Sequence, residues 1–396
     1  MPNKNEGPEG GFASGLPPKR TKDEWAKKLC VVPRTVVEAA DEVQLLEVLG
    51  RATNAYAPTG LAIALALEVE AILHTRYERL DEAVAGRGAR AYAGQDGLLV
   101  AGSIGVGKSR GIGLILEQFP KQIPRSATSA ISGPWMQVPC LYVQCPPAAS
   151  LVDFFDAAVR NMAPLIGLNL RENPQFVRHK ANDLYQLFRS MATEHALGVV
   201  VVDEIQNISA QKSQGVEALK NSLVRLTQES SVPVVAIGTP PAKNLIAGSG
   251  RTARRFAERL QLWDPFDRES KEWSLVARAI WGSRALDRGR VFTDGIGNAL
   301  FDASEGVPSF AQILLGDAQR VAFKREHDDD DERTRIVDCA RDKTIDLEKM
   351  VKVAVEHALI GKYVVDLKRQ RDLGPTACRE PEVQLLRLQV KKKKAA

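Results

Sequence analysis

Short apolar runs alternate with longer amphipathic segments between about residues 91 and 265. The short runs are continuously apolar, which indicates strands buried on both faces, as in a parallel sheet that carries helices on each side. The predicted strands are GLLVAG from Gly97, CLYVQC from Cys140, GVVVVD from Gly198, VPVVAIG from Val232 and RLQLW from Arg259. A helical pattern from Ser213 places four apolar residues on one face, Val216, Leu219, Leu223 and Leu226. The pattern therefore predicts an α/β core built on a parallel sheet.

The segments before and after this core have different patterns. Residues 1–20 are rich in Gly, Pro and Lys, so we expect a flexible arm, and residues 21–90 have the pattern of a helical N-terminal extension. Beyond Trp263 no further strand is predicted, and helical patterns cover about 269–283, 292–303 and 308–325. We therefore expect an α/β core over 91–265, followed by a small all-helical unit over 266–325.

The C-terminal region, residues 326–396, combines an acidic loop, a helical segment and a basic tail. The block REHDDDDER has the composition of a solvated loop, and the helical pattern lies near 345–370. The lysines of the final KKKKAA fit a DNA-attracting tail, a partner motif and a solubilising end equally well.

Composition restricts the classes of protein that remain. The net charge of the 396 residues is only +5, so any case for nucleic-acid binding depends on local clusters of basic residues. The five cysteines include no C-x-x-C pair, which favours reduced thiols in a cytoplasmic protein over disulfides or a zinc site. The N-terminus lacks the apolar core of a secretory signal. The apolar segment from Gly60 is too short for a membrane span and contains Glu68 and Glu70.

The strand that starts at Gly97 runs into GSIGVGKS, a complete G-x-x-x-x-G-K-S pattern. A buried strand before the pattern and a helix after it are the context of a phosphate-binding loop. Its backbone N–H groups and the helix N-terminus would hold phosphates of ATP, Lys108 would reach the β- and γ-phosphates, and Ser109 would ligate Mg²⁺. The alternative is a glycine-rich turn that binds nothing. The candidate residues are Gly102, Ser103, Ile104, Gly105, Val106, Gly107, Lys108, Ser109 and Arg110.

The run VVVVDEIQN predicts a central strand that ends in two acids, Asp203 and Glu204. Open α/β sheets bind ligands at the carboxyl ends of their strands. Asp203 would hold Mg²⁺, directly or through water, and Glu204 would act as the general base that orients the attacking water. The second acid favours hydrolysis over a kinase or a switch, and the alternative is that the two acids only cap a strand end.

Two further features complete the candidate site. Thr239 follows the strand that ends at Gly238, where its hydroxyl could sense the γ-phosphate, although threonine is also a common turn residue. Four arginines then lie around the start of the last strand, and one of them could stabilise transition-state charge at a neighbouring subunit's γ-phosphate. Our first choice is Arg255 and our second Arg254, and the alternative is a solvated or DNA-facing loop. The four are Arg251, Arg254, Arg255 and Arg259.

The whole set of motifs resembles an AAA+ ATPase, and within that class the TnsC/TniB family of transposition regulators. The resemblance covers about residues 70–325 and is most specific over 198–241, where DEIQN is followed by a helix and a VPVV-x-x-GT strand. VPCLYVQCPPAASLVDFF, SEGVPSFAQILLGDAQRVAF and YERLDEAV are similar to further segments of this family. The resemblance implies a three-layer P-loop AAA+ sandwich with a small all-helical lid.

The resemblance also implies a function. Members of the family use ATP to assemble as rings or helical filaments around double-stranded DNA. They link a target-selector protein (TniQ/TnsD-like) to the transposase, and hydrolysis takes the assembly apart. One departure is that GVPS places Ser309 where many AAA+ lids have a sensor arginine, so we expect slow, assembly-dependent hydrolysis.

Binding along duplex DNA requires basic side chains aimed at phosphates. Any one of the candidates could instead be ordinary solvated surface, but we expect at least two to contact phosphate. His179 and His195 lack metal-ligand spacing and are assigned no chemistry. The candidates are Arg171, Arg178, Lys180, Lys212 and Lys220.

Two other functions remain open. A helicase loader, replication initiator or secretion-associated AAA+ protein would be expected to carry a helix-turn-helix or a peptidoglycan-binding segment after the lid, and residues 326–396 have no clear sign of either. A small-molecule kinase would use the same P-loop, but it leaves the arginine cluster and the helical lid unexplained.

Overall fold

The structure is a computed structural model. It describes residues 10–33, 54–86, 97–127, 133–146, 150–170, 181–209, 214–242, 259–286, 289–324, 345–346, 364 and 367–368. The chain divides into two compact units, and each is considered separately below. The first consists of Met1–Cys30 with Pro58–Asp264, and the second of Val31–Ala57 with Pro265–Ala396.

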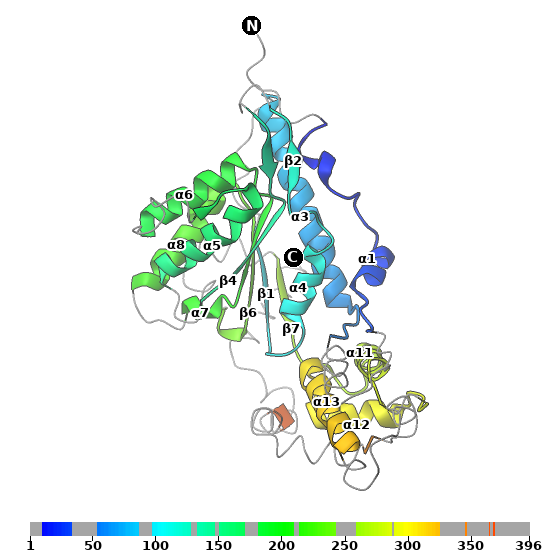
Figure 1. The fold of residues 1–396 in the computed structure, drawn as a ribbon. Helices are drawn as coiled ribbons and strands as arrows, with labels where there is room; N and C mark the ends of the chain where they lie inside the picture. The colour runs from blue at the N-terminus through cyan, green and yellow to red at the C-terminus, as the bar shows by residue number, and fades with distance from the viewer. Residues whose placement is uncertain are drawn as a thin grey trace, which may run out of the picture. The chain divides into compact units, whose positions relative to one another are not determined.

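A parallel five-stranded sheet forms the centre of the first unit (Figure 1). Its order is β4-β5-β6-β1-β7, so the strand before the P-loop lies between the last strand and the strand that leads to Thr239. All five strands predicted from the sequence are present, and a parallel five-stranded sheet with flanking helices fits the expected P-loop AAA+ fold. Their bounds are β1 Gly97–Gly102, β4 Cys140–Gln144, β5 Val199–Asp203, β6 Val234–Gly238 and β7 Leu260–Trp263.

Helices cover both faces of this sheet, which is why its central strands β1, β5 and β6 are continuously buried (Figure 1). The edge strand β4 instead alternates, with Tyr142 and Gln144 exposed. On one face, alternate strand residues such as Val143, Val200 and Val202 pack into a core with the apolar sides of three helices. These are α5 Leu151–Met162, α6 Ala181–Glu194 and α8 Gln214–Glu229. The opposite face is covered by α3 Gly60–Val84 and α4 Lys108–Leu116. The result is the predicted three-layer sandwich.

A short antiparallel hairpin, which the sequence did not predict, joins α4 to β4. It pairs β2 Ile123–Arg125 with β3 Trp135–Gln137. Three-residue strands have too little alternation to stand out in a sequence.

The N-terminal segment packs against this hairpin and α3 from Gly10 onward, so a flexible arm does not describe residues 10–20. Phe12, in the 3₁₀-helix η1 Phe12–Gly15, is buried and stacks on Tyr77. Its carbonyl oxygen accepts hydrogen bonds from Arg125 and Gln137, each at 2.9 Å. A few specific contacts therefore order a segment whose composition alone suggested flexibility.

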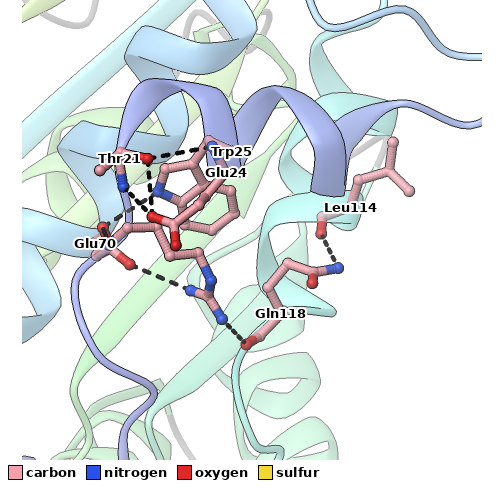
Figure 2. Close-up of polar contacts among 7 residues, drawn as sticks. Thr21, Glu24, Trp25, Glu70, Leu114 and Gln118 are labelled. Carbon is pink, nitrogen blue, oxygen red and sulfur yellow. Dashed lines mark hydrogen bonds and ion pairs between the residues drawn. The ribbon is translucent and has the colours of Figure 1, made fainter.

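A buried carboxylate, Glu70 of α3, anchors the next part of this segment (Figure 2). It accepts hydrogen bonds from the backbone N–H of Arg20 at 2.9 Å, from Nη1 of Arg20 at 3.2 Å and from Nε1 of Trp25 at 3.2 Å. Nη2 of Arg20 donates to the carbonyl of Gln118, just beyond α4. Helix α1 Lys22–Leu29 begins here with a capping box between Thr21 and Glu24.

The second unit contains a small helical core. Helices α11 Lys271–Gly282, α12 Asp294–Ser304 and α13 Pro308–Lys324 occupy the predicted segments. They bury two tryptophans, Trp273 and Trp281. Val31 and Tyr56 form an isolated antiparallel bridge within this unit. The acidic block and most of the helical segment expected near 345–370 lie outside the described residues.

Among the helices that the structure describes, none combines the length and apolarity needed to cross a membrane.

Replacing Glu70 with alanine is expected to lower the free energy of unfolding of the first unit by about 3 kcal/mol, because it leaves the Arg20 guanidinium and the Trp25 N–H without their buried acceptor. Urea denaturation followed by tryptophan fluorescence measures this change. The matched control on the same helix is Glu78→Ala, which breaks an ion pair with Lys19 whose side chains are both more than half exposed. It is expected to cost about 0.5 kcal/mol. Equal losses in the two variants would contradict an anchoring role for Glu70.

Candidate nucleotide-binding site

The predicted phosphate loop is a turn between the end of β1 at Gly102 and the start of α4 at Lys108. Gly105 and Gly107 have φ angles of 80° and 97°, a left-handed conformation that other residues adopt only with strain. Gly107 is the N-cap of α4 and has no side-chain acceptor for the first helical N–H groups. These N–H groups are therefore available to an anion, as in other phosphate-binding helix termini.

Lys108 is buried at the base of this loop and is 8% exposed. Its Nζ atom donates to the carbonyl oxygens of Gly102 at 2.8 Å and Ser103 at 2.7 Å. Loss of hydration lowers the pKa of Lys108 to about 8, although the charges of Asp203 and Glu204 oppose this shift. Carbonyl dipoles only partly replace water around an ammonium group. A phosphate group at this position would supply the missing negative charge, so the loop fits a nucleotide polyphosphate.

Asp203 is buried at the carboxyl end of β5, and both of its oxygens are already hydrogen-bonded. Oδ1 accepts from the backbone N–H of Glu204 at 2.8 Å, and Oδ2 accepts from the Tyr142 hydroxyl at 2.7 Å. Burial, together with the hydrogen bond to Asp203 and the nearby charges of Asp203 and Glu204, raises the pKa of Tyr142 above its usual value. Tyr142 therefore remains a donor that fixes the orientation of the Asp203 carboxylate.

Glu204 occupies a strained turn immediately after the strand. Its φ angle of 56° is left-handed, which is uncommon for a residue other than glycine, and such strain is often found at functional sites. The flanking backbone holds the turn in place, because Cys145 N–H donates to the Asp203 carbonyl at 2.9 Å and Ile205 N–H donates to the Ile237 carbonyl at 3.0 Å.

Gln206, for which the sequence predicts no role, connects Glu204 with Thr239. Its side-chain amide donates from Nε2 to Oε2 of Glu204, and its Oε1 accepts from the backbone N–H of Thr239 at 3.0 Å. The glutamine is visible in the DEIQN motif, but only the fold brings the Thr239 strand end beside it. Tyr142 had a weaker signal, as one of two polar positions, with Gln144, in the otherwise apolar run CLYVQC.

The residues present also fit Mg²⁺. Ser109, in the first turn of α4, is exposed, and Asp203 comes from β5 at the same edge of the sheet. A hydroxyl, a carboxylate, phosphate oxygens and water are the ligands that Mg²⁺ takes in nucleotide sites. Ser109 and Asp203 would hold the ion, which would neutralise phosphate charge. Within the described part of the chain, no group of three or more His, Cys, Asp or Glu side chains could hold a metal by itself.

Several predicted residues lie outside the described part of the chain. They are Arg251, Arg254, Arg255, Arg171, Arg178, Lys180 and Lys212. Lys220 belongs to α8. Arg259 is described, and its guanidinium lies 3.8 Å from the Glu68 carboxylate of α3. His195 contacts the Met136 carbonyl through Nδ1 at 2.7 Å, a contact that supports the hairpin.

ATP affinity is expected to fall about tenfold between pH 7 and pH 9. In the free chain Lys108 loses its proton with a pKa near 8, whereas bound phosphates keep Lys108 protonated. Binding must then be accompanied by proton uptake above pH 8, so the affinity decreases as the pH rises. Isothermal titration calorimetry with a non-hydrolysable analogue, in two buffers of different ionisation enthalpy, measures both quantities.

The control for this prediction is Lys108→Arg, whose guanidinium stays charged throughout this range. Its affinity for the analogue should show no such slope, whatever its absolute value. A wild-type affinity that does not change between pH 7 and pH 9 would contradict the assignment of Lys108 to the phosphates.

The model of the family described as Bacterial TniB protein matches residues 77–265, a segment that includes all five strands of the sheet. No curated protein matches the chain significantly. Among solved structures, a Walker-type ATPase of Pyrococcus abyssi aligns with 76% of this chain and 76% of its own length, at 14% identity and a TM-score of 0.45. Residues 77–265, with the phosphate loop and both acids of the candidate site, are thus similar to the TniB family.

Proposed function

We propose that this protein is an ATP-dependent regulator of DNA transposition that assembles on double-stranded DNA and leaves it when ATP is hydrolysed. The observation that carries the proposal is the grouping of Lys108, Asp203, Glu204 and Thr239 at the carboxyl ends of three adjacent strands, β1, β5 and β6. The similarity of the same segment to the TniB family supports the link to transposition.

Each of these residues has a separate role in ATP hydrolysis. Lys108 and the N–H groups of the loop bind the phosphates, and Ser109 and Asp203 hold Mg²⁺. Glu204 accepts a proton from the attacking water, and the Thr239 hydroxyl senses the γ-phosphate. The two hydrogen bonds of Gln206 support these roles for Glu204 and Thr239, because they hold the Glu204 carboxylate beside the end of β6.

Assembly couples this chemistry to DNA. Arg255, or Arg254 as second choice, reaches the γ-phosphate of a neighbouring subunit, so that hydrolysis needs the ring or filament. Arg171, Arg178, Lys180, Lys212 and Lys220 are the proposed contacts to DNA phosphates. A target-selector protein and the transposase are the proposed partners of the assembled form.

The Glu204→Gln variant is expected to bind ATP normally but to hydrolyse it at least about 100-fold more slowly, because it lacks the general base. It should therefore accumulate on duplex DNA as rings or filaments in the presence of ATP. Electron microscopy and sedimentation with duplex DNA measure the assembly, and phosphate release measures the turnover.

Lys108→Ala is the matched control, because it removes the charge that holds the phosphates and should neither bind ATP tightly nor assemble. A Glu204→Gln variant that binds ATP yet stays a dispersed monomer on DNA would contradict the assembly proposal. Assembly of Lys108→Ala with ATP would contradict the role of the nucleotide.

Mixing two inactive variants tests whether Arg255 acts across a subunit interface. Arg255→Ala retains its own Glu204 but lacks the arginine, whereas Glu204→Gln lacks the base but offers Arg255 to its neighbour. Mixed assemblies should recover hydrolysis at interfaces where an Arg255→Ala site faces a Glu204→Gln neighbour. Turnover by the mixture should exceed the sum of the separate variants several-fold.

The control for mixing is the double variant Glu204→Gln with Arg255→Ala, which cannot donate the arginine and should rescue nothing. If the mixture is no more active than its components, Arg255 does not act in trans, and the same experiment with Arg254→Ala then tests the second choice.

A further inference from the structure

We infer that Gln206 is a positioning residue that fixes the Glu204 carboxylate relative to the strand end at Thr239, so that the base and the sensor move as one unit. The inference rests on the proposed hydrolytic role of Glu204. Gln206 lies in the short helix α7 Gln206–Ser209, directly after the strained turn that presents Glu204.

The orientation of the Gln206 amide follows from its two partners. The Glu204 carboxylate can only accept hydrogen bonds when ionised, so it must face the amide nitrogen. The backbone N–H of Thr239 can only donate, so it must face the amide oxygen. The two bonds are therefore compatible with only one orientation of the side chain, and a residue without both a donor and an acceptor cannot replace it.

The end of β6 is shaped to admit this side chain. A Cβ atom on Gly238 would lie 2.5 Å from Oε1 of Gln206, and 3.0 Å from atoms of both Ala242 and Ile205. Any larger residue at position 238 would therefore displace Gln206 from Thr239. This explains why glycine precedes threonine at the strand end, a requirement that the turn alone does not impose.

The backbone on both sides of Gln206 is held separately. Ile205 N–H donates to the Ile237 carbonyl at 3.0 Å, and Asn207 N–H donates to the Glu204 carbonyl at 2.9 Å. The Asn207 side chain donates to the Cys145 carbonyl at 2.9 Å. The start of α7 is thus fixed without Gln206's side chain, which leaves that side chain to link Glu204 with Thr239.

The bridge leaves the reacting groups available. It uses Oε2 of Glu204, so Oε1 can accept the proton of water, and it uses the backbone N–H of Thr239, so the proposed sensor hydroxyl is not consumed. If contact with a γ-phosphate shifts the end of β6, the two hydrogen bonds of Gln206 would pass that shift to the Glu204 carboxylate.

The test is Gln206→Met, which keeps the length of the side chain but removes both hydrogen bonds. Turnover of the full chain on duplex DNA is expected to fall about ten- to hundredfold, the effect of displacing a catalytic group by roughly 1 Å. The affinity for a non-hydrolysable ATP analogue should stay within threefold of wild type. A purely structural role would instead lower affinity and turnover together.

Two further variants make the result specific. Gln206→Glu keeps the acceptor for Thr239 but faces Glu204 with a second carboxylate, and it should lose turnover at least as strongly. Asn207→Ala removes the neighbouring bond to Cys145 and should retain turnover within threefold. Wild-type turnover in both Gln206 variants would overturn the inference, as would a loss of ATP affinity equal to the loss of turnover.

The experiment separates this inference from the proposed function. If Glu204→Gln stops hydrolysis while both Gln206 variants hydrolyse normally, only the positioning role fails. If Glu204→Gln itself hydrolyses at the wild-type rate, the proposed role of the base fails first. In the Glu204→Gln background, Gln206→Met should cause no further loss of residual turnover, since its effect acts through Glu204.

Discussion

The candidate site depends on a parallel sheet whose three central strands, β1, β5 and β6, are buried along their whole length. Because these strands have no solvent-facing side, their polar groups lie at their ends, and parallel alignment brings the carboxyl ends to one edge. Asp203, at the end of β5, and Thr239, directly after β6, stand at that edge together with the loop after β1. The order β5-β6-β1 makes their strands direct neighbours. The apolar packing that stabilises the first unit therefore also brings the candidate site residues together at one edge of the sheet.

Polar groups at this edge are held at some energetic cost. Lys108 is buried with carbonyl partners, and its pKa falls to about 8 because an ammonium group loses hydration there. Glu204 adopts a left-handed backbone conformation that most residues avoid. A bound, negatively charged ligand would offset the first cost, whereas the flanking backbone hydrogen bonds at Cys145 and Ile205 hold the second in place. Local strain and desolvation thus coincide with the residues to which the chemistry is assigned.

The sequence predicted the sheet and the main site residues because both depend on local patterns. Four consecutive valines before Asp203 identify a buried strand, and the spacing of glycines before Lys108 identifies a phosphate loop. The hairpin at Ile123–Arg125 and Trp135–Gln137 was missed because each strand has only three residues. The role of Gln206 could not be read from the sequence, because its second partner, Thr239, is 33 residues away and meets it only after β5 and β6 pair.

The order of the N-terminal segment also could not be predicted, because its composition suggested flexibility and its partners are distant in the sequence. Arg20 donates to the carbonyl of Gln118 and to the Glu70 carboxylate, and its guanidinium lies 4.8 Å from the centre of the Trp25 ring. Gln118 follows the helix that begins at Lys108, so α4 carries the phosphate loop at one end and this contact at the other. Arg20 therefore connects the N-terminal segment to the chain just after the helix whose first turn follows the phosphate loop.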